Sequence, residues 1–434
     1  MLNPLFDSLA YFVNPNRYPV KMPSHLISDL KLDESIAERD FEYASRFLWE
    51  YSGRKSTYEA YRKEIERLLL WCWTIEGIDL LSLKRDHIRS FIRFCEKPPK
   101  NWIDKSNYPR FINKQGTRLP NPKWRPFTRW RFEIERIPGP NNTFTENKIR
   151  VLDVEKNLDN DSVQALFAII SSLFSFLDQE EISEGQNPIR ALRQKSQFMS
   201  KPQKMEPRRL SNLEKDYLYK AAKQMADNDP NQHSRTLFMI ILMVEMYMRI
   251  SELVERYRYE DGQKILEWRP EMGDIKRDPH GNWFLTTLGK GRKERDIAVP
   301  DRVMSALKTF RETLGLTALP AANESTPLIP ALKTSQEPNL SAALQQTGQI
   351  REAFHNCSKL AIELMQADGY KTEDYVSLSG SSPHWLRHTG ISEAVKVRPR
   401  EHVRDDAGHG SSETTDRYIN SDKQERAASA NFKN

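Results

Sequence analysis

Hydrophobic residues recur at three- and four-residue steps along much of the chain, which predicts a mainly helical protein. The segment Thr57–Glu76 is the first clear example. Its apolar side chains fall on a single helical stripe, formed by Tyr61, Ile65, Leu68, Leu69 and Trp73. Ser56 or Thr57 is suited to cap the start of this helix. Gly77 is expected to end it.

The helical pattern occurs in two blocks separated by a less regular region. The first block starts near Asp33 and includes Leu83–Phe94 and Ser162–Glu180. Between these two helices, residues 98–147 are rich in Pro, Gly and Asn and show no sustained period, which favours an inserted segment of strands and loops. The second block begins at Ser211, whose sequence Ser-Asn-Leu-Glu is a capping-box pattern.

In the second block, helices are expected over residues 211–226, 236–255, 301–314, 340–367, 383–396 and 400–407. Two short β-type runs, Trp283–Thr287 and Arg295–Val299, flank a Gly-Lys-Gly turn and predict a hairpin. A chain of 434 residues is too long for one ordinary domain. The expected parts are an extension (1–32), a helical domain (33–188) with an insertion at 98–150, a basic linker (189–209), and an α-rich domain with a small antiparallel sheet (210–434) that ends in a tail (419–434).

The positive charge of the chain is concentrated. The net charge is +6, but residues 97–150 hold 13 Lys and Arg against 4 Asp and Glu, together with eight aromatic residues. A second basic stretch, Arg190–Arg209, has seven basic residues and one acid. Such charge with interleaved aromatics suits a polyanion such as DNA, and a solvated basic face is the alternative. The candidate DNA-binding residues are Arg125, Arg129, Arg131, Lys195 and Lys201.

Several classes of protein are disfavoured. No membrane span is expected, because the nearest apolar run, Leu237–Tyr247, is about half the usual length of ~20 residues and contains Glu245. The N-terminus lacks the pattern of a secretory leader. Three scattered cysteines do not form a disulfide framework or a zinc site. These features predict a protein of a reducing, cytoplasmic compartment.

Two motifs place basic residues where packing alone would not. Met248–Leu253 (MRISEL) is expected to close an apolar helix, where Arg249 is costly unless it meets an anion. Glu252, three residues on, can orient that guanidinium, and a local surface ion pair is the alternative. Lys290 lies between two glycines at the hairpin tip, where it can deliver a proton or a charge into a cleft. A plain basic turn is the alternative there.

The other two motifs contain histidines. His384 and His388 have the spacing of a helical zinc pair, but no Glu lies between them and Arg387 would repel a cation, so a metal site is disfavoured. His384 and Arg387 instead form an anion clamp with a proton acceptor beside it. The last motif contains His409 in a Gly-flanked turn and Tyr418 nine residues later.

Together these groups suit attack on a phosphodiester without a metal. Two guanidiniums can neutralise the non-bridging oxygens of the transition state. A Tyr hydroxyl, with an ordinary pKa of about 10, needs a base and a cationic field to become a nucleophile. The departing 5′-oxygen needs a proton from a general acid such as Lys.

The four motifs resemble the boxes of the tyrosine recombinase (phage integrase) family, in order and in the nine-residue spacing from His to Tyr. The resemblance covers roughly residues 209–422 and extends more weakly to the first domain, which resembles the family's helical core-binding (SAM-like) domain. It implies the tyrosine recombinase fold, which is mainly α. It also implies that Arg249, Arg387 and His409 bind the scissile phosphate while Glu252 supports the arginines.

The resemblance further implies that Tyr418 forms a 3′-phosphotyrosyl link, that Lys290 protonates the 5′-oxygen and that His384 takes the Tyr proton. No cofactor, ATP or metal is then required. Family members act as tetramers on two double-stranded DNA sites through a Holliday junction, and the tail after Tyr418 would dock on a neighbouring protomer. The insertion at 98–150 departs from the family's compact domain, either to add DNA or partner contacts or as a structural elaboration.

The leading functional hypothesis is therefore a bacterial, nucleoid-associated recombinase that integrates and excises a mobile element, with a possible excision factor and no membrane partner. A Xer-like resolvase of chromosome or plasmid dimers is an alternative with the same chemistry. From another class, the chain can be a DNA-binding protein with an inactive recombinase domain. A metal-dependent relaxase is disfavoured, since its His-hydrophobe-His cluster is not present in the sequence.

Overall fold

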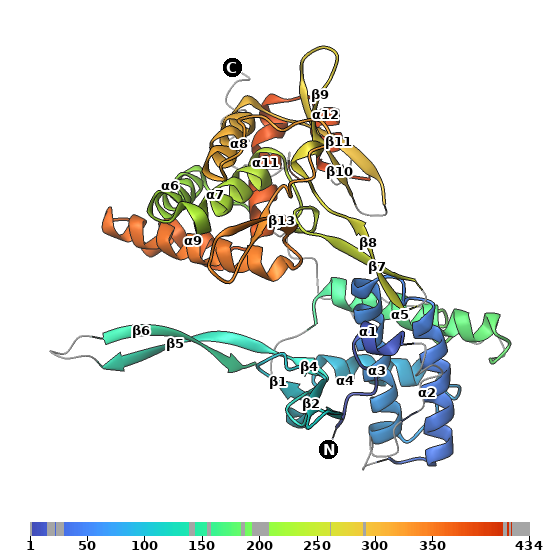
Figure 1. Cartoon of the computed structure of the whole chain (residues 1–434). Coiled ribbons are helices and arrows are strands. Elements are labelled where there is room, and N and C mark those ends of the chain that lie inside the picture. Colours follow the sequence, from blue (N-terminus) through green and yellow to red (C-terminus); the bar gives the residue numbers. More distant parts are fainter. Residues whose placement is uncertain are drawn as a thin grey trace, which may run out of the picture. The chain divides into compact units, whose positions relative to one another are not determined.

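The computed structural model divides the chain into two compact units (Figure 1). Unit 1 consists of Met1–Gln203 and Arg258–Ile265, and unit 2 of Lys204–Tyr257 and Leu266–Asn434. The residues described are 2–14, 22, 30–138, 144–153, 158–183, 187–192, 208–260, 262–289, 292–410, 415 and 418. Lys290, Lys195 and Lys201, like the tail at 419–434, lie outside them.

The residues described for unit 1 include five α-helices: α1 (Leu9–Phe12), α2 (Glu34–Trp49), α3 (Lys55–Trp71), α4 (Arg85–Glu96) and α5 (Asn160–Gln179). The predicted helix over 57–76 is α3 followed by a π-helical turn, Cys72–Glu76, and it ends at Gly77 with φ +74°, as expected. The predicted cap is wrong. Ser56 and Thr57 lie inside the helix, because it begins after Arg54.

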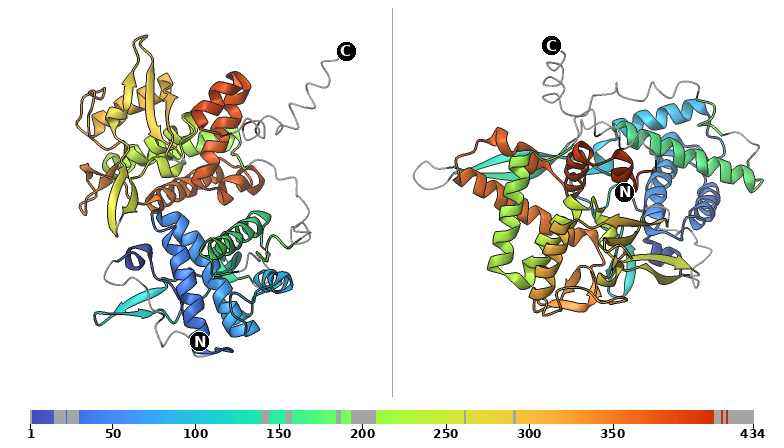
Figure 2. Two further views of the ribbon diagram at one scale, coloured as in Figure 1. Left: turned by 90° about the vertical axis from the view of Figure 1, so that its right-hand side faces the viewer. Right: turned by 90° about the horizontal axis from the view of Figure 1, so that it is seen from above.

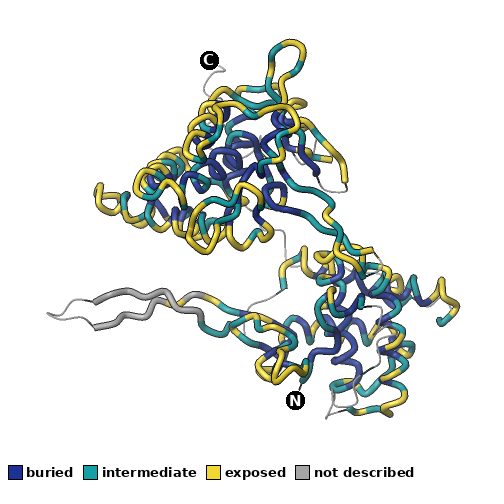
Figure 3. Tube along the Cα trace, viewed as in Figure 1, coloured by how far each residue is buried: buried dark blue, intermediate teal, exposed yellow. Residues whose placement is uncertain are grey.

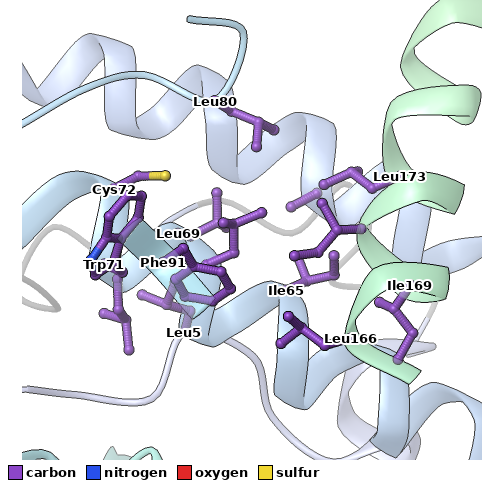
Figure 4. Packing of buried hydrophobic residues seen from close by; sticks show 14 of the residues in the cluster. Leu5, Ile65, Leu69, Trp71, Cys72, Leu80, Phe91, Leu166, Ile169 and Leu173 are labelled. Atoms are coloured by element: carbon purple, nitrogen blue, oxygen red, sulfur yellow. The ribbon is translucent and has the colours of Figure 1, made fainter. Parts of the chain in front are cut away.

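The core of unit 1 joins the apolar faces of its helices (Figure 4). Ile65 and Leu69 of α3 and Leu166 and Leu173 of α5 are all buried, and burying each such side chain contributes about 1.5–3 kcal/mol. By length and composition, α5 is the one helix in the described part of the chain that is apolar enough to cross a membrane, which the sequence analysis did not anticipate. Its buried face packs on α2 and α3, so it serves as a core helix.

The insertion contains strands, as expected, and its described residues form three small two-stranded sheets. β1 (Ile103–Asp104) pairs in parallel with β4 (Phe127–Thr128). β2 (Phe111–Lys114) with β3 (Thr117–Pro120), and β5 (Trp130–Pro138) with β6 (Phe144–Leu152), form antiparallel hairpins. Figure 1 shows the longer hairpin, β5–β6, extending from the sheets at its base.

Aromatic and basic residues of the insertion hold it to its own unit. Trp102, Trp124 and Phe127 are each 2% exposed and belong to the core of unit 1. Arg110 binds the buried carboxylate of Glu66 at 2.9 Å. Arg118 of β3 makes two hydrogen bonds of 2.7 Å to Asp7. Much of the basic and aromatic character of this segment therefore stabilises unit 1.

Unit 2 contains seven helices among its described residues, which follow one another from green to red in Figure 2. They are α6 (Asn212–Asn228), α7 (Pro230–Glu245), α8 (Asp301–Thr313), α9 (Thr347–Ala367), α10 (Thr372–Gly380), α11 (Pro383–Val397) and α12 (Arg400–Ala407). The predicted capping box at Ser211 is present, with its hydroxyl and Glu214 bonding each other's backbone.

Small antiparallel sheets accompany these helices. β9 (Ile275–Arg277), β10 (Trp283–Leu288) and β11 (Glu294–Ala298) form a three-stranded sheet in the order β11-β10-β9. β12 (Pro330–Leu332) pairs with β13 (Pro338–Ala343). β7 (Arg256–Glu260) pairs with β8 (Gln263–Trp268), and residues Arg258–Ile265 of this hairpin belong to unit 1. Figure 3 shows that each unit has its own buried interior. The expected combination of helices with a small antiparallel sheet is confirmed.

Two predicted helices of unit 2 have wrong bounds, and the one expected from residue 236 already begins at Pro230. The helix expected over 236–255 ends at Glu245, because Tyr247 takes a left-handed φ of +55° and Arg249 is extended. The helix expected over 340–367 begins only at Thr347, because residues 338–343 pair with β12 instead. Arg249 therefore lies in the connection after α7 and precedes a 3-10 turn at Ile250–Glu252.

Helices α7 and α11 cross in direct backbone contact. A Cβ added at Gly390 would lie 1.9 Å from the carbonyl oxygen of Val244. Real Cβ atoms do not come that close, so only glycine fits at this crossing. The crossing brings Arg387, which lies one helical turn before Gly390, against the backbone of Tyr247.

Candidate active site

Glu252 is the anionic centre of the site. Its carboxylate is fully buried and accepts two hydrogen bonds of 2.9 Å from Arg295 of β11. It also accepts hydrogen bonds from the backbone N–H of Arg249 at 2.8 Å and from the Arg249 guanidinium at 3.1 Å. Burial by itself would raise the pKa of Glu252, but the hydrogen bonds and charge of the two arginines hold it below its ordinary value.

Three arginines meet the C-terminal end of α12. Arg295 donates to the carbonyl of Asp406 at 3.0 Å, Arg387 to that of Ala407 at 2.5 Å, and Arg249 to that of Gly408 at 3.1 Å. The last carbonyls of a helix lack intrahelical partners and carry partial negative charge, so they bind cations well. These successive carbonyls fix all three guanidiniums relative to one helix end.

Arg387 is the most buried of the three. It is 2% exposed, and its other terminal nitrogen donates to the carbonyl of Tyr247. Burial and the positive charges of Arg249 and Arg295 lower the pKa of Arg387 to about 9. The three arginines repel one another, and Glu252 is the one acid among them. The cluster therefore favours the binding of a further anion.

Tyr418 lies against this cluster. Its ring packs on a small apolar group formed by α11, α12 and Tyr247. It stacks on His409, with the ring centroids 5.9 Å apart and the planes at 10°. Its hydroxyl oxygen lies 2.5 Å from Nδ1 of His388. His409 is itself held by a hydrogen bond of 2.8 Å to the buried Thr415.

The sequence analysis missed two of these partners. It named His388 only as half of a disfavoured zinc pair and gave Arg295 no role, although both lie inside the motifs it quoted. His384, the predicted proton acceptor, places its ring edge-on against His388, with centroids 4.4 Å apart. Which of the two histidines contacts Tyr418 depends on how distant segments pack together. The spacing of residues within one motif cannot show this.

The pKa values of the three histidines of the site are all lowered. Burial and neighbouring cationic groups lower the pKa of His388 to about 4, and they do the same for His409. The pKa of His384 is also lowered, by desolvation and by the charges of Arg387 and Arg249. An uncharged imidazole keeps one ring nitrogen free to accept a proton.

The predicted hairpin that carries Lys290 is present as β10 and β11. These strands pair up to Leu288 and Glu294. Arg256 donates to the carbonyls of Leu288 and, at 3.1 Å, Gly289, and so holds the backbone that leads into the turn. Lys290 itself lies outside the described residues, so its position as general acid stays a prediction.

The basic candidates of the insertion differ from one another. Arg129 is 4% exposed and donates to the carbonyls of Glu96, at 2.8 Å, and Cys95, at the end of α4, so its guanidinium fastens the insertion to α4. Arg125 bonds to nearby backbone carbonyls, and Arg131 forms a surface ion pair of 2.6 Å with Glu133. Of these three, Arg131 is the exposed one.

Metal ligands do not cluster among the described residues, where no group of three or more His, Cys, Asp or Glu side chains is suited to hold an ion. The cysteines Cys72, Cys95 and Cys357 are unpaired and buried. What the site does bring together is guanidinium, imidazole and phenol groups. This set can bind an anion and supply a nucleophilic oxygen.

The chain, with its helices and small antiparallel sheets, has the fold of the tyrosine recombinases, as expected from the sequence. The chain is similar in structure to the XerH site-specific recombinase in its post-cleavage complex with a palindromic difH substrate, with a TM-score of 0.52, 14% identity and 99% of each chain covered.

A lambda integrase dimer bound to a COC′ core site gives a TM-score of 0.47, 13% identity, and coverage of 88% of this chain and 77% of that one. The Tn1549 transposon integrase in complex with circular intermediate DNA gives a TM-score of 0.37 and 15% identity, and the match covers 64% of this chain and 80% of that one. No protein-family model and no curated protein sequence matches the chain.

Proposed function

We propose that this chain is a site-specific DNA recombinase that cleaves and rejoins DNA through a phosphotyrosyl intermediate on Tyr418. One observation carries the proposal. Arg249, Arg295 and Arg387 converge on the C-terminal end of α12. Tyr418 stacks on His409, which follows that end, and its hydroxyl is held by His388. A positioned phenol beside a cluster of guanidiniums suits attack on a phosphodiester.

The proposed reaction uses only side chains. Arg249 and Arg387 bind the non-bridging oxygens and stabilise the negative charge that these oxygens carry in the transition state. Donors of this kind typically stabilise a transition state by about 3–4 kcal/mol each. Tyr418 attacks the phosphorus, the bond to the 5′-oxygen breaks, and Lys290 supplies the proton to that oxygen. The 3′-phosphotyrosyl link keeps the phosphodiester energy for rejoining, so the proposal includes no cofactor.

In the full proposal, two double-stranded DNA sites and a homotetramer exchange strands through a Holliday junction, and the protein integrates and excises a mobile element in the bacterial cytoplasm, associated with the nucleoid. An excision factor would set the direction of the reaction. This part extends the family resemblance of the sequence to the whole reaction cycle.

Resolution of chromosome or plasmid dimers is the second candidate, with the same chemistry. The likeness to XerH over 99% of each chain favours it. Recombination between two sites on one supercoiled plasmid, without integration into a separate DNA molecule, would support this candidate. A DNA-binding protein with an inactive domain is disfavoured, because binding alone requires no phenol positioned on an imidazole.

The test is formation of a covalent adduct in EDTA without ATP. The substrate is a library of nicked duplexes with randomised sequence around the nick, which lets the cleaved strand diffuse away and traps the intermediate. The wild-type protein should give adducts that persist on a denaturing gel, and the recovered DNA identifies the site. Tyr418→Phe should bind the recovered site equally well and form none. Adducts formed by the Phe variant would refute Tyr418 as the nucleophile.

A further inference from the structure

The partner of the Tyr418 hydroxyl is the starting point. Nδ1 of His388 lies 2.5 Å from that oxygen, a short hydrogen bond, and the two rings are 5.5 Å apart with their planes at 32°. His384 contacts the ring of His388. His388 is therefore the imidazole whose nitrogen is already in place for proton transfer from the phenol.

We propose that His388, and not His384, is the general base that takes the proton of Tyr418 during DNA cleavage. The inference rests on the proposed recombinase function and refines it. The Tyr418 O–H bond breaks and its proton moves to Nδ1 of His388. The phenolate oxygen forms a bond to phosphorus, and the bond to the 5′-oxygen breaks. In rejoining, the 5′-hydroxyl gives its proton back to the general acid proposed above and attacks phosphorus. The bond between phosphorus and the Tyr418 oxygen breaks, and His388 returns its proton to that oxygen.

The helix around His388 fixes the orientation of this imidazole. The preceding residue, Arg387, is anchored to two carbonyls. The following residue, Thr389, donates to the carbonyl of Trp385 at 2.8 Å and accepts from the backbone N–H of Leu210 at 2.9 Å. Gly390 then locks α11 against α7. A base held on a rigid helix needs no rearrangement before it acts.

The charges around His388 connect its basicity to DNA binding. His384 and Arg387 on α11, and Arg208 at the start of unit 2, all lower its pKa, after burial. The phenol of Tyr418 and the uncharged ring of His409 face it from the other side. A phosphate bound by Arg387 would offset that positive charge and make His388 a stronger base. The site would therefore activate its nucleophile more strongly when the DNA phosphate is bound.

The test compares wild type, His388→Asn, His388→Ala and His384→Asn in single-turnover adduct formation on the nicked duplex recovered above. Asn keeps a hydrogen-bond acceptor near the position of Nδ1 but cannot take a proton. We expect both His388 variants to bind the duplex normally and to lose a factor on the order of 100 or more in rate. His355→Asn, an exposed change on α9, is the matched control and should behave as wild type.

A substrate with sulfur in place of the bridging 5′-oxygen distinguishes loss of the general base from loss of the general acid, because a thiolate leaves without needing a proton. The defect of His388→Asn should persist on it. A fluorinated tyrosine at position 418, with a more acidic phenol, should restore much of the rate to His388→Asn and little to wild type. This comparison is made within one background, so it holds even if the variant is less stable.

Three results would overturn the inference. A His388→Asn rate close to wild type, with only His388→Ala slow, would show that His388 merely positions Tyr418. A His388→Asn defect that disappears on the sulfur substrate while that of His384→Asn remains would assign the base to His384. Absence of rescue by fluorotyrosine would exclude a proton-transfer role. If wild type formed no adduct, the proposed function would itself fail, and this inference with it.

Discussion

Arg295 and Glu252 face each other through two parallel hydrogen bonds of 2.9 Å, although β11 and the turn after α7 are more than 40 residues apart in the chain. The pair connects the hairpin that carries the predicted general acid to the segment that carries Arg249. Removing one partner of a buried ion pair leaves an uncompensated charge.

Glu252→Gln should therefore lower the free energy of unfolding by about 3–5 kcal/mol, and urea denaturation measures the change. The matched control is Glu363→Gln, whose carboxylate forms an exposed pair with Lys359 at 3.9 Å. Exposed pairs of that kind contribute less than about 1 kcal/mol. Equal effects of the two changes would contradict the central role of Glu252.

Gly390→Ala should separate α11 from α7. The added methyl group would collide with the carbonyl of Val244, so the helix that carries Arg387 and His388 must shift, and adduct formation should fall together with stability. Gly348→Ala in α9 is the control, because nothing lies within 4 Å of its Cβ position. In an open helical site, Ala in place of Gly stabilises by about 0.4–1 kcal/mol. Thermal unfolding of both variants tests the contrast.

The stability of unit 2 should fall on mild acidification. The pKa of His388 and of His409 is about 4 in the folded chain, against about 6.5 when unfolded. The unfolded chain then binds more protons between these two values, so this part of the stability is present above about pH 6.5 and is lost as the pH falls towards 4. Urea titrations across this range should show a smaller loss for His388→Asn than for wild type. An equal loss would contradict the low pKa.

Two arginines of the insertion should respond differently to substitution. Arg129→Ala removes a buried guanidinium that satisfies two carbonyls, so it should destabilise unit 1 by about 1–3 kcal/mol. Arg131→Ala removes an exposed charge and should leave stability unchanged within ~0.5 kcal/mol. If the exposed face of the insertion contacts DNA, this second variant should bind more weakly and with a shallower salt dependence. Unchanged binding would favour a structural role for the insertion.

Tyr418 contacts His388 and His409 of its own chain, which predicts cleavage in cis. A mixture of Tyr418→Phe and Arg387→Ala proteins should then form no adduct, because each chain lacks one part of a single site. Activity of the mixture would show that the tyrosine acts on a phosphate bound by a neighbouring chain. Each variant assayed alone is the control.

Local periodicity correctly predicted the helices and strands that have one apolar face. The helices at 383–396 and 400–407 and the hairpin around Lys290 lie within about two residues of α11, α12 and β10–β11. The errors fall where distant segments decide. Residues 338–343 are a strand because β12 pairs with them, and α7 stops at Glu245.

The same distinction separates what could and could not be foreseen at the site. Arg249, Glu252, Arg387 and Tyr418 could be identified as candidates, because the position of each within its own motif is visible in the sequence. Which histidine meets the phenol depends on how α11 is oriented in unit 2, and that orientation depends on distant contacts such as that of Gly390 with Val244 of α7, 146 residues earlier. Spacing alone gave no reason to prefer His388.

The three carbonyls at the end of α12 also have an electrostatic meaning. While Arg249, Arg295 and Arg387 cover them, their partial negative charge is screened from an incoming phosphate. Truncating any one of these side chains would remove a positive charge and also uncover an oxygen that repels the phosphate, so binding would weaken by more than the loss of that one charge. Restoring positive charge with free guanidinium in solution would then require the small cation to bind that carbonyl first.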